Sequence, residues 1–232
     1  MSSVVSPIAM CRPRFSLKLL LFAVLVVCVA LALVRGRLAS HAAAIKAIET
    51  NGGAIRYRGT SSLKARISTA LFADNRLLSV ASVEIHGRAL NAESRRALPR
   101  LGTVTTLAVT SVALSRLDLD AIYECKTIRE LTLHGCQFED RTLGSLAQFP
   151  RLESLNLGMS NVSDAAIPSI LGQPHLHSLY VHGTDITDLG LTRLQALPNL
   201  QRMTLSRHVI NQEAIEAFSQ QKPSVTLTVF GP

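Results

Sequence analysis

The chain has few of the residues and motifs that build reactive sites. Its 232 residues include no tryptophan, only 4% aromatic residues and four cysteines. The cysteines form no C-x-x-C pair, which excludes the common cysteine-based zinc motifs. The sequence also lacks a G-x-S-x-G elbow, a phosphate-binding glycine loop, an H-E-x-x-H pair and a dinucleotide-binding glycine fingerprint. We therefore expect no enzyme activity, no cofactor, no metal ion and no small-molecule substrate.

Acidic residues are scarce only in the first third of the chain. Residues 1–70 contain ten Lys and Arg but a single acid, Glu49, whereas residues 71–232 contain fourteen basic and fifteen acidic residues. The formal charge of +8 and the pI near 9.9 therefore come from the N-terminal region. A nucleic-acid-binding domain carries its basic residues on the folded surface. The distribution therefore argues against nucleic acid as a partner.

Long apolar runs are absent except near the N-terminus. The stretch FSLKLLLFAVLVVCVALALV, residues 15–34, has one charged residue, Lys18, and approaches the ~20 residues that a helix needs to cross a bilayer. It predicts an uncleaved signal anchor and a single-pass membrane protein. The alternative is a cleaved signal peptide with its processing site in SHAAA. Arg35 and Arg37 lie between the apolar run and that site, which favours the anchor.

Basic residues flank this run on both sides. Arg12, Arg14 and Lys18 lie at its N-terminal end, and Arg35 and Arg37 follow it. Flanking positive charge is the main determinant of orientation in a membrane. Because the two sides nearly balance, the sequence leaves open which side of the membrane the rest of the chain faces.

The rest of the chain repeats one apolar phrase every 24 residues. The phrase reads apolar-x-x-apolar-x-apolar, and it holds its spacing over residues 80–229. Such a period indicates stacked units, each with a short strand, a turn and a helical stretch. The phrase begins at Val80, Val104, Ile128, Leu152, Leu176 and Leu200, and a partial seventh copy supplies Leu227 and Val229.

Alternation along each strand predicts an outward face. The fourth and sixth residues of a phrase point inward, so the third, fifth and seventh point outward. Most outward residues are small and polar, which suits either a solvated face or a shallow binding surface. The larger outward groups are the candidates for binding a protein or peptide. They are Glu130, His134, Asn156, Tyr180, His182 and Arg202.

Three histidines recur before a turn glycine at intervals of 48 residues. They are His86, His134 and His182, and all three fall at the seventh place of a phrase. Two strand spacings, about 10 Å, separate successive histidines, whereas zinc needs each ligand within about 2.1 Å. We therefore expect no metal ion shared by these three residues.

The pattern L-x-x-L-x-L-x-x-N/C-x-L resembles the leucine-rich-repeat family. The stretch LHSLYVHGTDITDLGLTRLQALPNL is similar to its 24-residue, cysteine-containing bacterial form. The resemblance implies a right-handed α/β solenoid with parallel strands on a concave face and helices on a convex face. The layout also resembles small bacterial membrane-anchored leucine-rich-repeat proteins, through RFSL at residues 14–17 and AIxxxGG at residues 47–53.

Polar residues in the turns are explained by the same resemblance. In the family, the side chain at the N/C place hydrogen-bonds the turn backbone inside the stack. Cys136, Ser160 and Thr184 occupy that place here and suit the role. Cys125 falls in a column of large apolar residues, so we expect it to be a small buried hydrophobic residue.

The sequence thus predicts four segments. A basic tail at 1–14 precedes the transmembrane anchor at 15–34, a basic juxtamembrane and cap segment follows at 35–79, and six repeats with a terminal strand occupy 80–232. The cap segment is expected to cover the open end of the first repeat, and its basic residues could also contact anionic headgroups.

Two functions fit this layout. The first is a membrane-anchored protein-interaction module that uses the concave strand face. The alternative is a structural envelope component in which the anchor and the basic cap matter more than any ligand-binding face.

Overall fold

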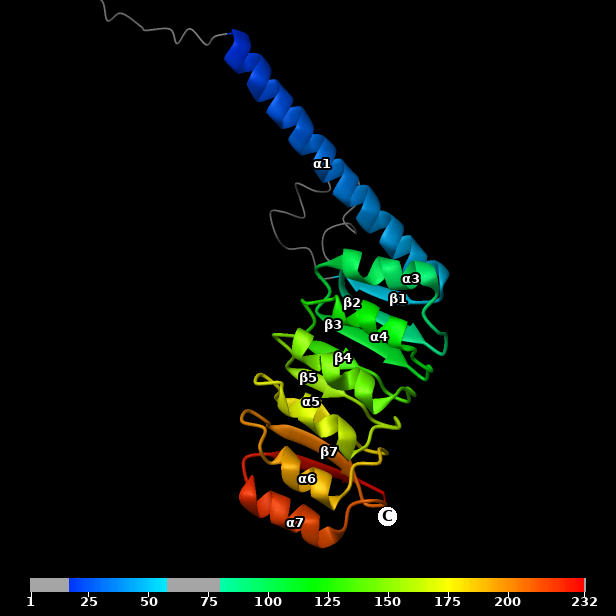
Figure 1. Ribbon diagram of the computed structural model, residues 1–232, viewed down its shortest axis with the longest axis vertical. Coiled ribbons are helices and arrows are strands. Elements are labelled where there is room, and N and C mark those ends of the chain that lie inside the picture. Colours follow the sequence, from blue (N-terminus) through cyan, green and yellow to red (C-terminus); the bar gives the residue numbers. More distant parts are fainter. Residues whose placement is uncertain (1–16, 58–79, 232) are drawn as a thin grey trace, which may run out of the picture. The chain divides into compact units, whose positions relative to one another are not determined.

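The computed structural model describes residues 17–57 and 80–231, and the chain divides into two compact units, Met1–Ala39 and Ser40–Pro232 (Figure 1). Helix α1, Leu17–Thr50, supplies the described part of the first unit and, from Ser40 onward, the start of the second. The second unit therefore includes part of the segment that the sequence separated from the repeats.

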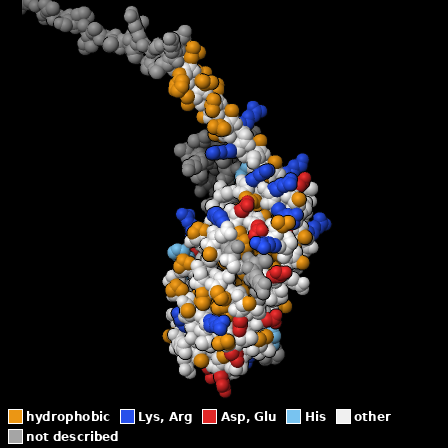
Figure 2. Space-filling view, in the orientation of Figure 1, with side chains coloured by type: hydrophobic (Ala, Val, Ile, Leu, Met, Phe, Trp, Pro, Cys, Tyr) orange, Lys and Arg blue, Asp and Glu red, His pale blue; other side chains and the backbone are white. Residues whose placement is uncertain are grey.

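In the first unit, helix α1 exposes its apolar side chains along residues 21–34 (Figure 2). The helix is long and apolar enough to cross a bilayer, a property that a signal sequence near an N-terminus shares. Arg35 and Arg37 follow the apolar run and are exposed. Arg12, Arg14 and the Lys18 side chain lie outside the described part of the chain.

The second unit is built on one eight-stranded sheet whose strands follow chain order. Strands β2 to β8 pair in parallel, and each residue lies beside the residue 24 positions later, as Val83 lies beside Leu107. This register confirms the repeat length read from the sequence. The strands are β1 (Ala54–Tyr57), β2 (Val80–His86), β3 (Thr106–Thr110), β4 (Glu130–Thr132), β5 (Ser154–Asn156), β6 (Ser178–Tyr180), β7 (Arg202–Ser206) and β8 (Thr226–Phe230).

A helical segment follows each strand from β2 to β7, and successive segments pack side by side (Figure 1). Side chains at the starts of several helices accept backbone N–H bonds, as Asn91 accepts from Ser94 and Asn211 from Ala214. The segments are α3 (Ala92–Ala97), η2 (Leu98–Leu101), α4 (Arg116–Tyr123), η3 (Asp140–Gln148), η4 (Asp164–Ala166), α5 (Ile167–Leu171), α6 (Asp188–Leu194) and α7 (Gln212–Gln221).

The hydrophobic core lies between the strands and the helical segments. In β2 to β7, the fourth and sixth residues of every phrase are buried, as the alternation predicted. They belong to one continuous cluster that extends from Ala44 to Val225. The mixed α/β character and the inward pattern are therefore confirmed.

Polar side chains inside the turns bond to backbone carbonyls. The Cys136 thiol lies 3.3 Å from a carbonyl oxygen of the preceding unit, and the Ser160 and Thr184 hydroxyls donate to carbonyls of their own units at 2.5 and 2.7 Å. This confirms their expected role. Cys125 is also buried, and that burial raises the pKa of its thiol to about 12.

The end of α1 and strand β1 cover the first repeat. Strand β1 pairs antiparallel with β2, and Ala44, Ile45 and Ile48 are buried in the common core. Gly53 packs so closely on Ile48 that a Cβ there would lie 2.6 Å from the isoleucine Cγ2. The described residues 40–57 thus have the contacts expected of a cap. Residues 58–79 of the predicted cap segment lie outside the description.

Candidate binding face on the strands

The outward residues of the strands do not all reach solvent. Ser178, Thr204 and Gly158 were expected on the open face, but each is buried. Larger neighbours lie across them: the Arg202 Nε donates to the Ser178 hydroxyl at 3.0 Å, and the His182 ring lies against both other residues. At these three positions the larger neighbouring side chains therefore cover the smaller residues.

Ring side chains make a continuous row on this face. The ring centroids of His134 and His182 are 5.6 Å apart with the planes tilted by 38°, and those of His182 and Phe230 are 5.0 Å apart with a 47° tilt. These rings are therefore much closer together than the backbones of alternate strands, which are about 10 Å apart. The expectation that the side chains would be as far apart as the backbones was wrong. We call His134, His182 and Phe230 the ring row.

Small residues on the intervening strands make the ring row possible. The seventh place of the phrase alternates in size, and Gly158 lies between the two histidines while Ser206 lies between His182 and Phe230. A Cβ added to Gly158 would lie only 2.5 Å from the His182 Cε1. The backbones remain two strands apart, but His182 extends over the glycine towards His134.

The His182 imidazole is held in place and kept neutral. Its Nδ1 lies 3.1 Å from the Thr204 Oγ1. Partial burial, and then the nearby His134, lower the pKa of His182 below its ordinary value. His182 is consequently a neutral donor or acceptor at physiological pH.

His86 also bonds a threonine of the next strand, but among the described residues no ring pairs with it. Its Nδ1 lies 2.6 Å from the Thr110 Oγ1, and its Nε2 lies 3.8 Å from a Glu84 carboxylate oxygen. It is exposed at the start of the sheet. The seventh place of the phrase therefore supplies a histidine on alternate strands. The residue at the same place on the strand between two histidines decides whether their rings can approach each other.

Three other predicted site residues lie on β4, β5 and β6. Tyr180 is half-buried, and it lies two residues before His182. Glu130 is exposed on β4 and accepts a hydrogen bond from Thr106. Asn156 accepts the backbone N–H of Gly158 at 2.9 Å, so its side chain supports the end of its own strand.

Phe230 is the site residue that sequence reasoning missed. It is 48% exposed and ends β8. The signal was present, because Phe230 takes the seventh place of the partial seventh phrase, 48 residues after His182. Extending the outward column by one unit would have included it.

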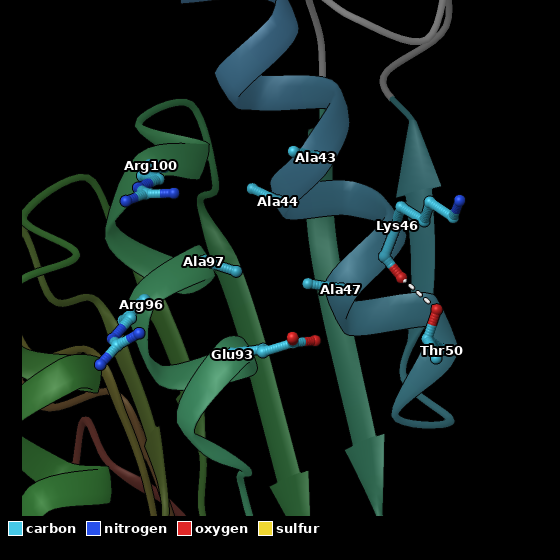
Figure 3. A pocket seen from close by; sticks show the side chains of 9 residues that line it. All are labelled: Ala43, Ala44, Lys46, Ala47, Thr50, Glu93, Arg96, Ala97 and Arg100. Carbon is cyan, nitrogen blue, oxygen red and sulfur yellow. Dashed lines mark hydrogen bonds between the residues drawn. The ribbon is translucent and has the colours of Figure 1, made fainter.

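A cleft of about 420 Å³ lies between the end of α1 and α3 with η2 (Figure 3). Ala44, Ala47 and Ala97 face into it, whereas Arg96 and Arg100 extend away from α1 (Figure 3). Because its charged groups do not converge, the cleft offers no defined polar site. Within residues 17–57 and 80–231, there is also no group of three or more His, Cys, Asp or Glu placed to hold a metal.

Comparisons with known proteins give distant structural likenesses only. No family model matches the chain, and no curated protein matches it. An internalin (InlF) from Listeria monocytogenes aligns with a TM-score of 0.47 and 15% identity, covering 68% of this chain and 49% of the internalin. The plant peptide hormone receptor RGFR1, solved in complex with RGF2, gives a TM-score of 0.40 and 12% identity over 66% of this chain and 33% of the receptor.

This chain spans about half the length of that internalin and a third of that receptor. At these levels of similarity the alignments carry no functional argument. The 24-residue register of the strands and the burial of the inward columns define the fold.

Proposed function

We propose that this chain is a membrane-anchored leucine-rich-repeat protein that binds another protein or a peptide on its strand face. The observation that carries the proposal is the ring row, which places partly exposed rings beside one another on the strand face. Aromatic groups and arginine are enriched in the buried cores of protein interfaces. Tyr180 and Arg202 lie on the same face and extend this surface.

The proposal includes the arrangement of the chain in a bilayer. Residues 15–34 form the anchor after a basic tail at 1–14, residues 35–79 form a basic cap, and residues 80–232 form a right-handed repeat solenoid with a concave strand face. The exposed apolar length of α1 supports the anchor. The burial of Ile48 and the pairing of β1 with β2 support the cap.

The binding face is tested by replacing Tyr180, His182 and Arg202 together with alanine in the full chain. Proteins crosslinked to the chain in its native membrane are then identified by mass spectrometry. We expect the triple variant to lose specific crosslinks that the wild-type chain retains. A matched control replaces three exposed residues of the helical side, Leu117, Arg193 and Glu216, and should keep those crosslinks. Unchanged crosslinks in the strand-face variant would refute the proposal.

The alternative, a structural role for the anchor and cap alone, is less well supported by the packing. Ala44, Ile45 and Ile48 are buried in the same core as the first repeat, so a cap without repeats would expose them to water. A truncated chain of residues 1–79 that restored function in cells lacking the protein would favour this alternative.

A further inference from the structure

We propose that His134 and His182 together bind one late first-row transition-metal ion, such as Cu²⁺ or Zn²⁺, with water in the remaining positions. The proposal is independent of protein binding at the same face. It rests on the ring contact, on the position of the His182 ring over Gly158, and on the hydrogen bond that fixes the His182 ring.

The separation of the two rings suits a shared ion. Imidazole nitrogen binds zinc at about 2.0–2.1 Å, so two rings that share an ion have centroids roughly 5–6 Å apart. The observed centroid distance is 5.6 Å. The separation of the rings is therefore compatible with one ion held between them.

The hydrogen bond of His182 leaves Nε2 as the ring nitrogen available to a metal. The position of a Cβ on Gly158 lies 2.5 Å from Cε1, 2.8 Å from Nε2 and 3.0 Å from Nδ1 of His182. The ring therefore lies over the strand that separates the two histidines. The other nitrogen, Nδ1, can donate its proton to the Thr204 hydroxyl at 3.1 Å, which leaves the Nε2 lone pair free. Metal-binding histidines commonly hydrogen-bond through the second ring nitrogen in this way.

The ligand type limits the choice of metal. Imidazole suits copper and zinc, and the general order of affinities places Cu²⁺ above Zn²⁺. No group of three or more His, Cys, Asp or Glu in the described residues is placed to hold a metal, so water would occupy the other coordination positions. From the order of affinities we expect Cu²⁺ to bind more tightly than Zn²⁺.

The test is a calorimetric titration of the purified full chain in detergent with Cu²⁺, accompanied by electron paramagnetic resonance of the complex. We expect one tight site whose spectrum shows two coordinating imidazole nitrogens. Residues that merely orient a metal ligand are worth about 10- to 100-fold in affinity. His134→Asn and His182→Asn should each weaken binding by at least about tenfold, leaving a single imidazole in the spectrum.

The chain offers matched controls. His86→Asn removes a histidine from the same repeat position whose Nδ1 bonds Thr110 and that pairs with no ring in the part of the chain that the structure describes, so Cu²⁺ affinity should not change. The double variant His175→Asn with His177→Asn removes the pair that lines a different cleft and should also bind normally. Gly158→Ala inserts a Cβ against the His182 ring and should weaken binding, with circular dichroism confirming that the fold is intact.

Two results would overturn the proposal. One is wild-type affinity and two coordinating nitrogens in His134→Asn, a variant that removes no hydrogen bond of the described fold. The other is loss of the tight site in the His175 and His177 double variant. Alanine at Tyr180 and Arg202 should leave Cu²⁺ affinity unchanged, so a failure of the metal site and a failure of the protein-binding face are separable.

Discussion

Replacing Ile48 with alanine tests whether the end of α1 caps the repeats. Ile48 is fully buried in the core that it shares with the first repeat, and a change of this type at a buried site costs about 2–5 kcal/mol. For a unit of this size, each kcal/mol lowers Tm by about 2–4 °C, so the expected decrease is on the order of 10 °C. Glu49→Ala, at an exposed position of the same helix, should leave Tm nearly unchanged.

The loss of stability should be local. In a stack of repeats each unit contacts only its neighbours, so damage at one end weakens that end first. Hydrogen exchange of the full chain in detergent should therefore show faster exchange in β2 for Ile48→Ala, with little change in β6. Gly53→Ala should act similarly, because its Cβ would lie 2.6 Å from the Ile48 Cγ2 and 3.1 Å from its carbonyl oxygen.

Unchanged melting together with unchanged exchange in β2 would refute the cap. Uniformly faster exchange from β2 to β8 would instead contradict the reasoning about local stability, because it would show that the stack unfolds as one cooperative unit. The two outcomes are distinguishable in a single experiment.

Three further predictions concern single residues. The Asp118 carboxylate accepts hydrogen bonds from the Ser115 backbone N–H at 2.8 Å, from the Ser115 hydroxyl at 2.6 Å and from Arg95 at 3.0 Å. Because Asp118→Ala removes all three bonds, it should lower the free energy of unfolding by about 2 kcal/mol, as measured by denaturant titration. Cys125 should resist a thiol reagent at neutral pH until the chain unfolds, as followed by mass spectrometry. Its raised pKa should add stability below pH 9.0 that is lost as pH rises towards about 12. Because the pKa of His182 is lowered from 6.5, its contribution is present above that pH and lost on acidification, so His182→Asn should weaken the acid dependence of Tm.

Much of the architecture could be predicted because it depends on repeated local patterns. The inward columns, including Val83 and Leu107, follow from strand alternation combined with the 24-residue period. The turn residues Cys136, Ser160 and Thr184 also behave as predicted, since each needs only a nearby carbonyl. These features repeat in sequence, so one unit informs the next.

The candidate site was predicted less completely. His134 and His182 were expected in one column of the strand face, but the contact between their rings was missed. Strand spacing fixes the distance between backbones, whereas the distance between rings also depends on where long side chains can extend. The prediction used the distance between the backbones in place of the distance between the rings.

The sequence by itself determined the period, the inward columns and the place of each outward residue, because these follow from chain geometry within one unit. Only the tertiary structure decided which outward side chains touch. That outcome depends on residues of neighbouring units, above all on the absence of a side chain at Gly158, which allows His182 to reach His134. The burial of Ile48 in the core of the repeats and the antiparallel pairing of β1 with β2 are likewise tertiary results, because both join residues that are far apart in the sequence.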